Sequence, residues 1–131
     1  MSGSSDARER AMALLYEASI RGLGIDDVLA GLAVDPVPLA VELATGVAEH
    51  HDDLDPVIAE SSVNWPLDRM PTMDRTILRL AAYELAHRPD VPMPVIIDEA
   101  VELAKRFSTD DSGRFVNGVL SRVAERLRPE S

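Results

Sequence analysis

Residues 71–88 read PTMDRTILRLAAYELAHR, and the spacing of apolar residues in this stretch decides the fold class. The apolar positions recur at intervals of three and four, which places them on one face of an α-helix: Met73, Ile77, Leu80, Ala81 and Leu85. A polar flank follows every fourth position: Arg75, Arg79 and Tyr83. The stretch therefore predicts a central amphipathic helix from Pro71 to about Arg88.

The chain downstream of this helix predicts two more. Three prolines between positions 89 and 94 enforce a connector, and a helix is expected over residues 95–107. Residues 108–112 read STDDS, a loop rich in capping oxygens, and a final helix is expected from there to about Leu127.

The chain upstream predicts shorter segments. A first helix is expected from the capping residues 4–6 to about Ile20, followed by a short helix over residues 26–32. A longer helix is expected from Pro36 or Pro38 to about His50, and Pro56 is expected in the first turn of another. The whole chain is thus predicted as one all-α domain, residues 1–131, of six or seven helices, with residues 1–6 as a flexible N-terminal arm.

The same periodicity selects the residues expected in the core. Each lies on the apolar stripe of its helix: Leu15, Ile77, Leu80, Leu85, Ala100, Ala104, Phe107, Val116, Val119 and Leu120.

Composition excludes several classes of protein. The chain has 131 residues, 46% hydrophobic, with no cysteine, so a disulfide-stapled secreted scaffold is excluded. Its apolar runs are far shorter than the roughly 20 residues that span a bilayer, and its first residues lack the features of a signal peptide. A cytoplasmic protein with no membrane association is the resulting expectation.

The net charge of −10 is unevenly distributed. Residues 1–65 carry three basic and twelve acidic groups, whereas residues 66–131 carry ten basic and eleven acidic groups. The overall acidity argues against loose, sequence-independent binding to nucleic acid, since polyanions repel one another. It leaves room for a local basic site in the second half.

The sequence contains no convincing motif for metal binding or catalysis. Residues 49–55 read EHHDDLD, but adjacent histidines on a helix point about 100° apart, so a solvated helix end is the better interpretation. Asp98, Glu99 and Glu102 fall in the first turns of a predicted helix, where carboxylates stabilise the helix dipole. No phosphate loop or nucleophile motif is found. The sequence therefore predicts no metal, no cofactor and no enzymatic activity.

Residues 114–120, RFVNGVL, are harder to explain as scaffold. Gly118 inside a helix costs about 1 kcal/mol relative to alanine. One interpretation is a close approach of two helices at Gly118, with Asn117 bonded to a neighbouring backbone. The other is a binding surface in which Arg114, Phe115 and Asn117 meet single-stranded RNA, whose splayed bases are stacked upon and read on their edges.

At these residues the sequence closely resembles the NusB family of bacterial transcription antitermination factors. The resemblance covers the pattern Ala-x-x-Leu-Leu-Tyr at residues 11–16 of the first helix, WPLDRMPTMDRTILRLAAYEL at residues 65–85, and VIIDEAVELAKRF at residues 95–107 followed by FVNGVL at residues 115–120. The STDD loop gives the chain an actinobacterial appearance. The resemblance implies two packed helical bundles and no catalysis.

The resemblance also implies partners and a site. The expected partners are the boxA segment of nascent ribosomal RNA, the ribosomal protein NusE and the elongating RNA polymerase complex. The residues expected to contact RNA are Arg8, Arg10, Tyr16, Asp74, Arg75, Ser112, Arg114, Phe115 and Asn117.

One departure from the family pattern keeps alternatives open. The family's N-terminal arm is usually a string of arginines, whereas Ser4, Ser5 and Asp6 stand here before Arg8 and Arg10. Fewer phosphate contacts predict weaker RNA binding. The alternatives are a divergent protein-interaction module, a homodimer with weak or no RNA binding, and a helical accessory domain of an RNA methyltransferase.

Overall fold

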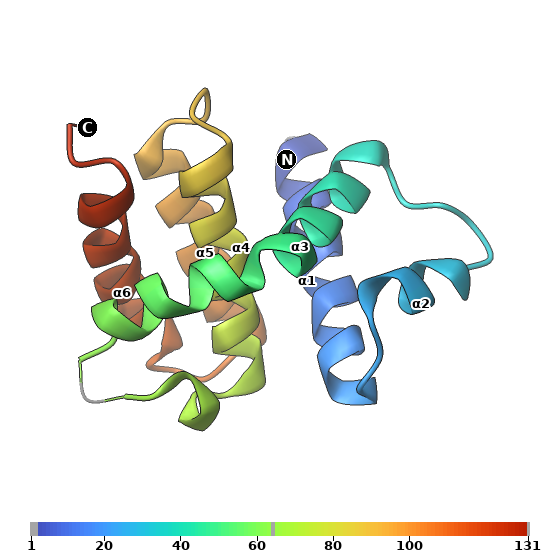
Figure 1. Cartoon of the computed structure of the whole chain (residues 1–131), viewed down its shortest axis with the longest axis horizontal. Helices are drawn as coiled ribbons and strands as arrows, with labels where there is room; N and C mark the ends of the chain where they lie inside the picture. Colours follow the sequence, from blue (N-terminus) through green and yellow to red (C-terminus); the bar gives the residue numbers. More distant parts are fainter. Residues whose placement is uncertain (1–2, 64, 131) are drawn as a thin grey trace.

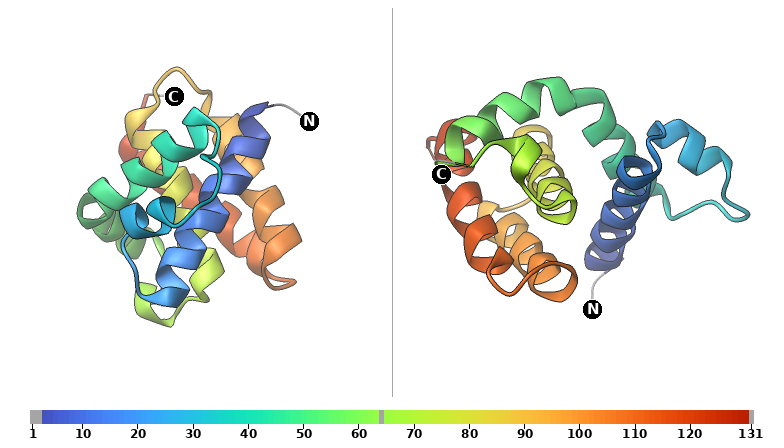
Figure 2. Two further views of the ribbon diagram at one scale, coloured as in Figure 1. Left: turned by 90° about the vertical axis from the view of Figure 1, so that its right-hand side faces the viewer. Right: turned by 90° about the horizontal axis from the view of Figure 1, so that it is seen from below.

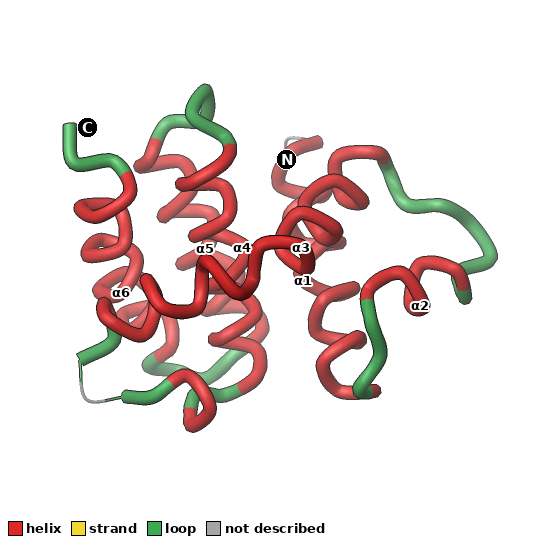
Figure 3. Tube along the Cα trace, in the orientation of Figure 1, coloured by secondary structure: helices red, strands yellow, loops and turns green. Residues whose placement is uncertain are grey.

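The computed structural model describes residues 3–63 and 65–130, and this part of the chain is helical without any strand (Figure 3). The elements follow in the order α1 (Gly3–Arg21), α2 (Ile25–Ala30), α3 (Pro38–Ser61), the 3-10 turn η1 (Leu67–Arg69), α4 (Thr72–His87), α5 (Met93–Phe107) and α6 (Ser112–Leu127). The all-α prediction is confirmed.

Helix α4 forms the centre of the molecule. It contacts α1, α3, α5 and α6, and ten of its sixteen residues are buried. Helices α4, α5 and α6 run side by side, while α1 and α2 lie on the other side of the molecule and α3 crosses in front of both groups (Figures 1 and 2). The α4 stripe deduced from the sequence therefore faces neighbours on several sides.

Helix α3 corrects the expected break near Pro56. The helix is continuous over 24 residues, with Pro56 inside it. Proline removes one backbone hydrogen bond and normally ends or kinks a helix. Here the buried side chains Leu54 and Ile58 flank it, 2% and 0% exposed, so tertiary packing holds the helix through the proline. Residues 49–55 consequently lie within a helix and not at a solvated helix end.

The N-terminal segment also differs from the expectation. Helix α1 begins at Gly3, so residues 3–6 form its first turn instead of a separate arm, and residues 1–2 lie outside the described part. The last residues of the expected helix 26–32 are likewise corrected, because α2 ends at Ala30.

Phe107 is the main error in the predicted core. Eight of the predicted core residues in α4 to α6 are 4% exposed or less, and Leu85 among them is 2% exposed. Phe107, the last residue of α5, is 40% exposed, and Leu15 is only partly buried. The apolar stripe of α5 continues to Phe107, but the helix ends there and the ring stays partly exposed.

The part of the chain that the structure describes contains neither a membrane-spanning helix nor a metal-binding cluster. None of its helices is both long and apolar enough to cross a membrane. Residues 3–63 and 65–130 also hold no group of three or more histidine, cysteine or acidic side chains arranged to bind a metal ion.

Candidate nucleic-acid interface

Asp74 and Ser112 lie together in a buried hydrogen-bond network between α4 and α6. Ser112 Oγ lies 2.8 and 3.0 Å from the two carboxylate oxygens of Asp74, and Ser108 Oγ donates to the same carboxylate. The backbone N–H of Thr109 donates to Ser112 Oγ at 3.2 Å. Asp74 is 3% exposed and Ser112 is 1% exposed, so neither reaches a ligand directly. Their role is to fix the loop between α5 and α6 against the start of α4.

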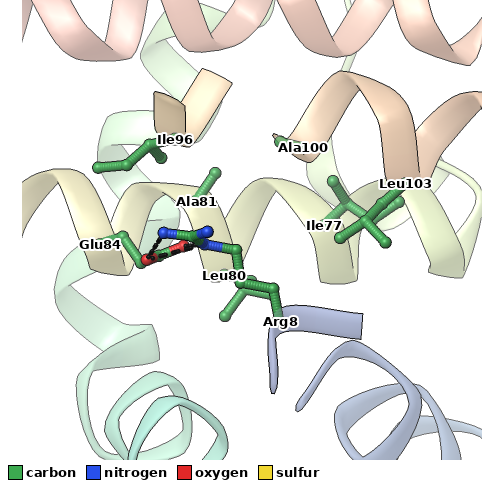
Figure 4. A pocket seen from close by; sticks show the side chains of 8 residues that line it. All are labelled: Arg8, Ile77, Leu80, Ala81, Glu84, Ile96, Ala100 and Leu103. Atoms are coloured by element: carbon green, nitrogen blue, oxygen red, sulfur yellow. Dashed lines mark hydrogen bonds and ion pairs between the residues drawn. The ribbon is translucent and has the colours of Figure 1, made fainter. Parts of the chain in front are cut away.

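Arg8 is also buried, which removes it from any surface. Its Nε and one terminal nitrogen donate to the two oxygens of Glu84 at 2.9 and 3.0 Å (Figure 4). The other terminal nitrogen donates to Glu99 at 3.1 Å. The apolar side chains of Leu80, Ala81 and Ile96 surround this cluster. Burial opposes the charge on Arg8, but Glu84 and Glu99 outweigh it and raise the pKa of the guanidinium. Arg8 thus stabilises the junction of α1, α4 and α5.

Four of the remaining predicted residues are accessible. Arg10, Arg114 and Asn117 are exposed, and their side chains make no hydrogen bond or ion pair within the described residues. Arg75 is half-buried and donates to the carbonyl of Leu67 at 3.1 Å, so it fastens η1 to the start of α4. Three unpaired polar groups are therefore free to meet a ligand.

Aromatic rings accompany these polar groups. Phe115 is half-buried, and its ring centroid lies 5.1 Å from that of Trp65. The guanidinium of Arg106 lies 4.7 Å from the ring centroid of Phe107. We define the helix-end surface as Arg75, Phe107, Arg114, Phe115 and Asn117, which lie where α4 begins, α5 ends and α6 begins. These three ends come together at one end of the bundle (Figure 1).

Arg10 and Tyr16 stand apart on α1. Tyr16 is half-buried, and its hydroxyl makes no hydrogen bond to the part of the chain that the structure describes. An ion pair of 2.8 Å between Glu9 and Arg106 joins α1 to the end of α5, next to the helix-end surface. Arg10 and Tyr16 therefore belong to a helix that is tied to this surface.

Among the described residues, no other helix packs closely against Gly118. A Cβ built there would meet only the guanidinium of Arg122, at 3.8 and 3.9 Å, which is ordinary contact. Asn117 is exposed and bonds no neighbouring backbone through its side chain. The close approaches occur instead at Gly46 and Gly113, where a Cβ would lie 2.3 Å from Tyr83 and 2.9 Å from Lys105. The poor helix formers of α6 thus stand on an open surface.

Sequence reasoning missed two accessible aromatic residues, Phe107 and Trp65. Phe107 was assigned to the core because it continued an apolar stripe. Trp65, 41% exposed, was noted only as the extended residue before Pro66. The available signal was position: Phe107 follows Arg106 at the end of α5, and Trp65 lies in the connector between α3 and η1, four residues before Arg69.

Comparison with known proteins places this arrangement in context. The model of the NusB family matches residues 5–125. The transcription antitermination protein NusB of Kineococcus radiotolerans is 46% identical over 129 residues, covering 95% of each chain. The protein of the same description from Anaeromyxobacter dehalogenans is 47% identical over 130 residues, covering 94% of this chain and 91% of its own.

Two solved structures have the same architecture. NusB of T. maritima superimposes with a TM-score of 0.89 at 32% identity, covering 99% of this chain and 96% of that chain. A crystal structure of the antitermination factors NusB and NusE in complex with double-stranded RNA contains a chain with a TM-score of 0.79 at 25% identity, covering 94% of this chain and 96% of that chain. The matched range 5–125 contains every residue of the helix-end surface.

Proposed function

Since the chain belongs to the NusB family, we propose that it is a non-catalytic transcription antitermination factor that binds boxA RNA of nascent ribosomal transcripts together with NusE. In this role it acts on the elongating RNA polymerase, and therefore in the cytoplasm. The similarity to the NusB chain of a complex with NusE and RNA supports the choice of partners.

The observation that carries the proposal is the composition of the helix-end surface. Arg114 supplies an unpaired cation for phosphates, Asn117 a free amide for a base edge, and Phe115 and Phe107 rings on which bases stack. These are the groups through which proteins recognise single-stranded RNA. The buried Asp74–Ser112 network holds the surface in one geometry.

We assign RNA contact to Arg10, Tyr16, Arg75, Arg114, Phe115 and Asn117 and add Phe107. Arg8, Asp74 and Ser112, which the resemblance also implied, act instead as buried supports. The net charge of −10 favours association with a basic ribosomal protein, because opposite fields accelerate encounter.

The test is binding of labelled boxA RNA and a scrambled RNA to the chain, to NusE and to their mixture, over a range of salt concentrations. We expect the mixture to bind boxA most tightly, and to prefer it over the scrambled RNA. Absence of co-elution with NusE and of RNA binding at micromolar concentration would contradict the proposal.

The second candidate is a homodimer or protein-interaction module without RNA binding. The burial of Arg8 favours it, because Arg10 is then the one free arginine among the first twenty residues that the structure describes. Light scattering on the isolated chain distinguishes it, since a stable dimer that excludes RNA would support this candidate.

A further inference from the structure

Trp65 lies beside the helix-end surface, at a corner formed by the end of α3 and by η1. A hollow of about 410 Å³ opens there, lined by Ala59, Ser62, Trp65, Pro66 and Arg69. We call this the Trp65 corner. One side of the indole packs on Phe115, with a ring-to-ring distance of 5.1 Å and an angle of 50°, while 41% of the residue stays exposed. One side of the indole thus contacts Phe115, and the rest of the ring is accessible to a ligand.

Cations stand on two sides of this corner. Arg69 is exposed and makes no ion pair within the described residues. Arg122 is exposed as well, and its Nε donates to the carbonyl of Ser61 at 2.6 Å, which fixes the guanidinium against the end of α3. Its terminal nitrogens remain near the open space over Gly118.

Acidic groups do not cancel these charges. Glu60, on the last turn of α3, is paired with Arg126 at 2.9 Å. Asp68 is exposed next to Arg69 in sequence, so it reduces the positive potential. Among residues 3–63 and 65–130, Arg114 and Arg122 on α6 have no acidic partner. The corner therefore offers an aromatic face with positive charge around it.

The chemistry of the lining selects the ligand. A protein anchor needs a well-packed pocket that excludes water, whereas this hollow is wide open and lined by small, polar and cationic groups around one indole. A flat aromatic face next to arginines suits a nucleic-acid base with its phosphates. Phe115 belongs to the helix-end surface and packs on Trp65 of the corner, so one RNA strand can follow both.

We propose that Trp65 stacks a base of single-stranded RNA that adjoins boxA, with Arg69 and Arg122 meeting its phosphates. This inference rests on the proposed function and extends the RNA path from the start of α6 to the end of α3. Arg75 maintains the path, because its bond to the carbonyl of Leu67 holds η1 in place.

Trp65 is the single tryptophan of the chain, so its fluorescence reports directly on this corner. The complex with NusE is titrated with boxA RNA alone and with boxA RNA extended by unstructured uridines at both ends. The signal of the Trp65→Phe complex is subtracted to remove any contribution from NusE. We expect the extended RNA to quench the Trp65 signal and to bind more tightly than boxA alone.

Substitutions in and near the Trp65 corner test which side chains contact the RNA. We expect Trp65→Ala to weaken binding of the extended RNA about tenfold, since loss of a stacking ring has an effect of this order. Trp65→Phe should retain most of the affinity, and Arg69→Gln should lower the logarithmic salt slope by about 0.7. Val63→Ala is the matched control, because Val63 is 68% exposed in the same loop and should leave RNA binding unchanged.

The possible failures are distinguishable. Normal boxA binding with no quenching and no loss in Trp65→Ala would overturn this inference and leave the proposed function intact. Quenching by NusE without RNA would make the corner a protein interface and would also overturn the inference. No binding of either RNA by the complex would overturn both proposals.

Discussion

Two arginines that stand two residues apart on α1, and so on different sides of the helix, illustrate how burial decides the role of a charge. Arg8 is enclosed and bonded to Glu84 and Glu99, whereas Arg10 is exposed and unpaired within the described residues. From sequence both are equal candidates for phosphate contact. The partner of Arg8 stands 76 residues away, so only the fold reveals the pairing.

We expect opposite phenotypes for the two residues. Arg8→Met should lower the free energy of unfolding by up to about 3–5 kcal/mol, because buried Glu84 loses its bonds to Arg8 and, among the residues described, keeps only the ion pair with Arg88. Arg10→Ala should leave stability unchanged and lower the logarithmic salt slope of RNA binding by about 0.7. Urea unfolding and RNA titration of both variants measure this. A stable Arg8→Met protein with a reduced salt slope would contradict the assignment.

Substitution of Asn117 should test RNA recognition without changing the stability of the fold. Its side chain is exposed and makes no hydrogen bond within the described residues, so Asn117→Ala should leave the melting temperature unchanged. If the amide reads a base edge, the variant should lose preference for boxA over a scrambled RNA while keeping its salt slope. Both quantities are measured on the same sample. Unchanged discrimination would remove Asn117 from the site.

At the scale of helices, Gly46 and Gly118 differ in the space that each leaves for an added methyl group. Gly46 in α3 lies against the ring of Tyr83 in α4, where a Cβ would approach to 2.3 Å, whereas a Cβ at Gly118 meets no closer atom than 3.8 Å. Gly46→Ala should therefore force α3 away from α4 and cost about 1–3 kcal/mol or more. Gly118→Ala should stabilise α6 by about 0.5–1 kcal/mol.

Thermal unfolding of the two alanine variants provides the measurement, and each serves as the control of the other. Gly118→Ala is also informative for RNA. If a strand passes over α6 at this point, the added methyl should weaken RNA binding despite the gain in stability. Equal melting temperatures for both variants would show that the α3–α4 contact is looser than described.

The helices were predictable because periodicity is a local property of the chain. α4, α5 and α6 begin and end close to the positions expected from their prolines, capping residues and apolar stripes. Pro56 was misjudged because a local rule predicts a break that buried contacts of Leu54 and Ile58 override. Phe107 was wrongly assigned to the core because the apolar stripe of a helix does not reveal where the neighbouring helices end.

The site was predictable only in part, and for a related reason. Residue type and family resemblance identified Arg114, Phe115 and Asn117, which the structure leaves accessible. The same resemblance could not separate them from Asp74 and Ser112, which are polar residues satisfied internally. Contact with solvent is a property of the packed molecule, so the distinction required the structure.

The stability of the whole molecule should fall at high pH through Tyr83. Burial, followed by the charges of Glu42 and Glu49, raises the pKa of the Tyr83 phenol. A raised pKa means that the folded state favours the neutral phenol, so this contribution is complete below the unfolded pKa of about 10 and is lost as pH rises above it.

Tyr83→Phe removes the ionisable group while keeping the ring between α3 and α4. We therefore expect the free energy of unfolding of the variant to decline less between pH 9 and pH 11 than that of the parent chain, as measured by urea titrations at each pH. Parallel pH profiles for the two proteins would assign the alkaline loss of stability to other groups.

Helix α3, which contacts α1 and α2 as well as α4 and α6, has a consequence for how the molecule comes apart. At about 1.5 Å per residue its 24 residues extend about 36 Å, so it belongs to both groups of helices. Neither group can open without exposing apolar residues of the shared helix, such as Leu43 or Ile58. We expect a single calorimetric transition, and slow amide hydrogen exchange at both ends of the buried part of α3 with equal opening free energies. Two transitions would mean that the groups open separately.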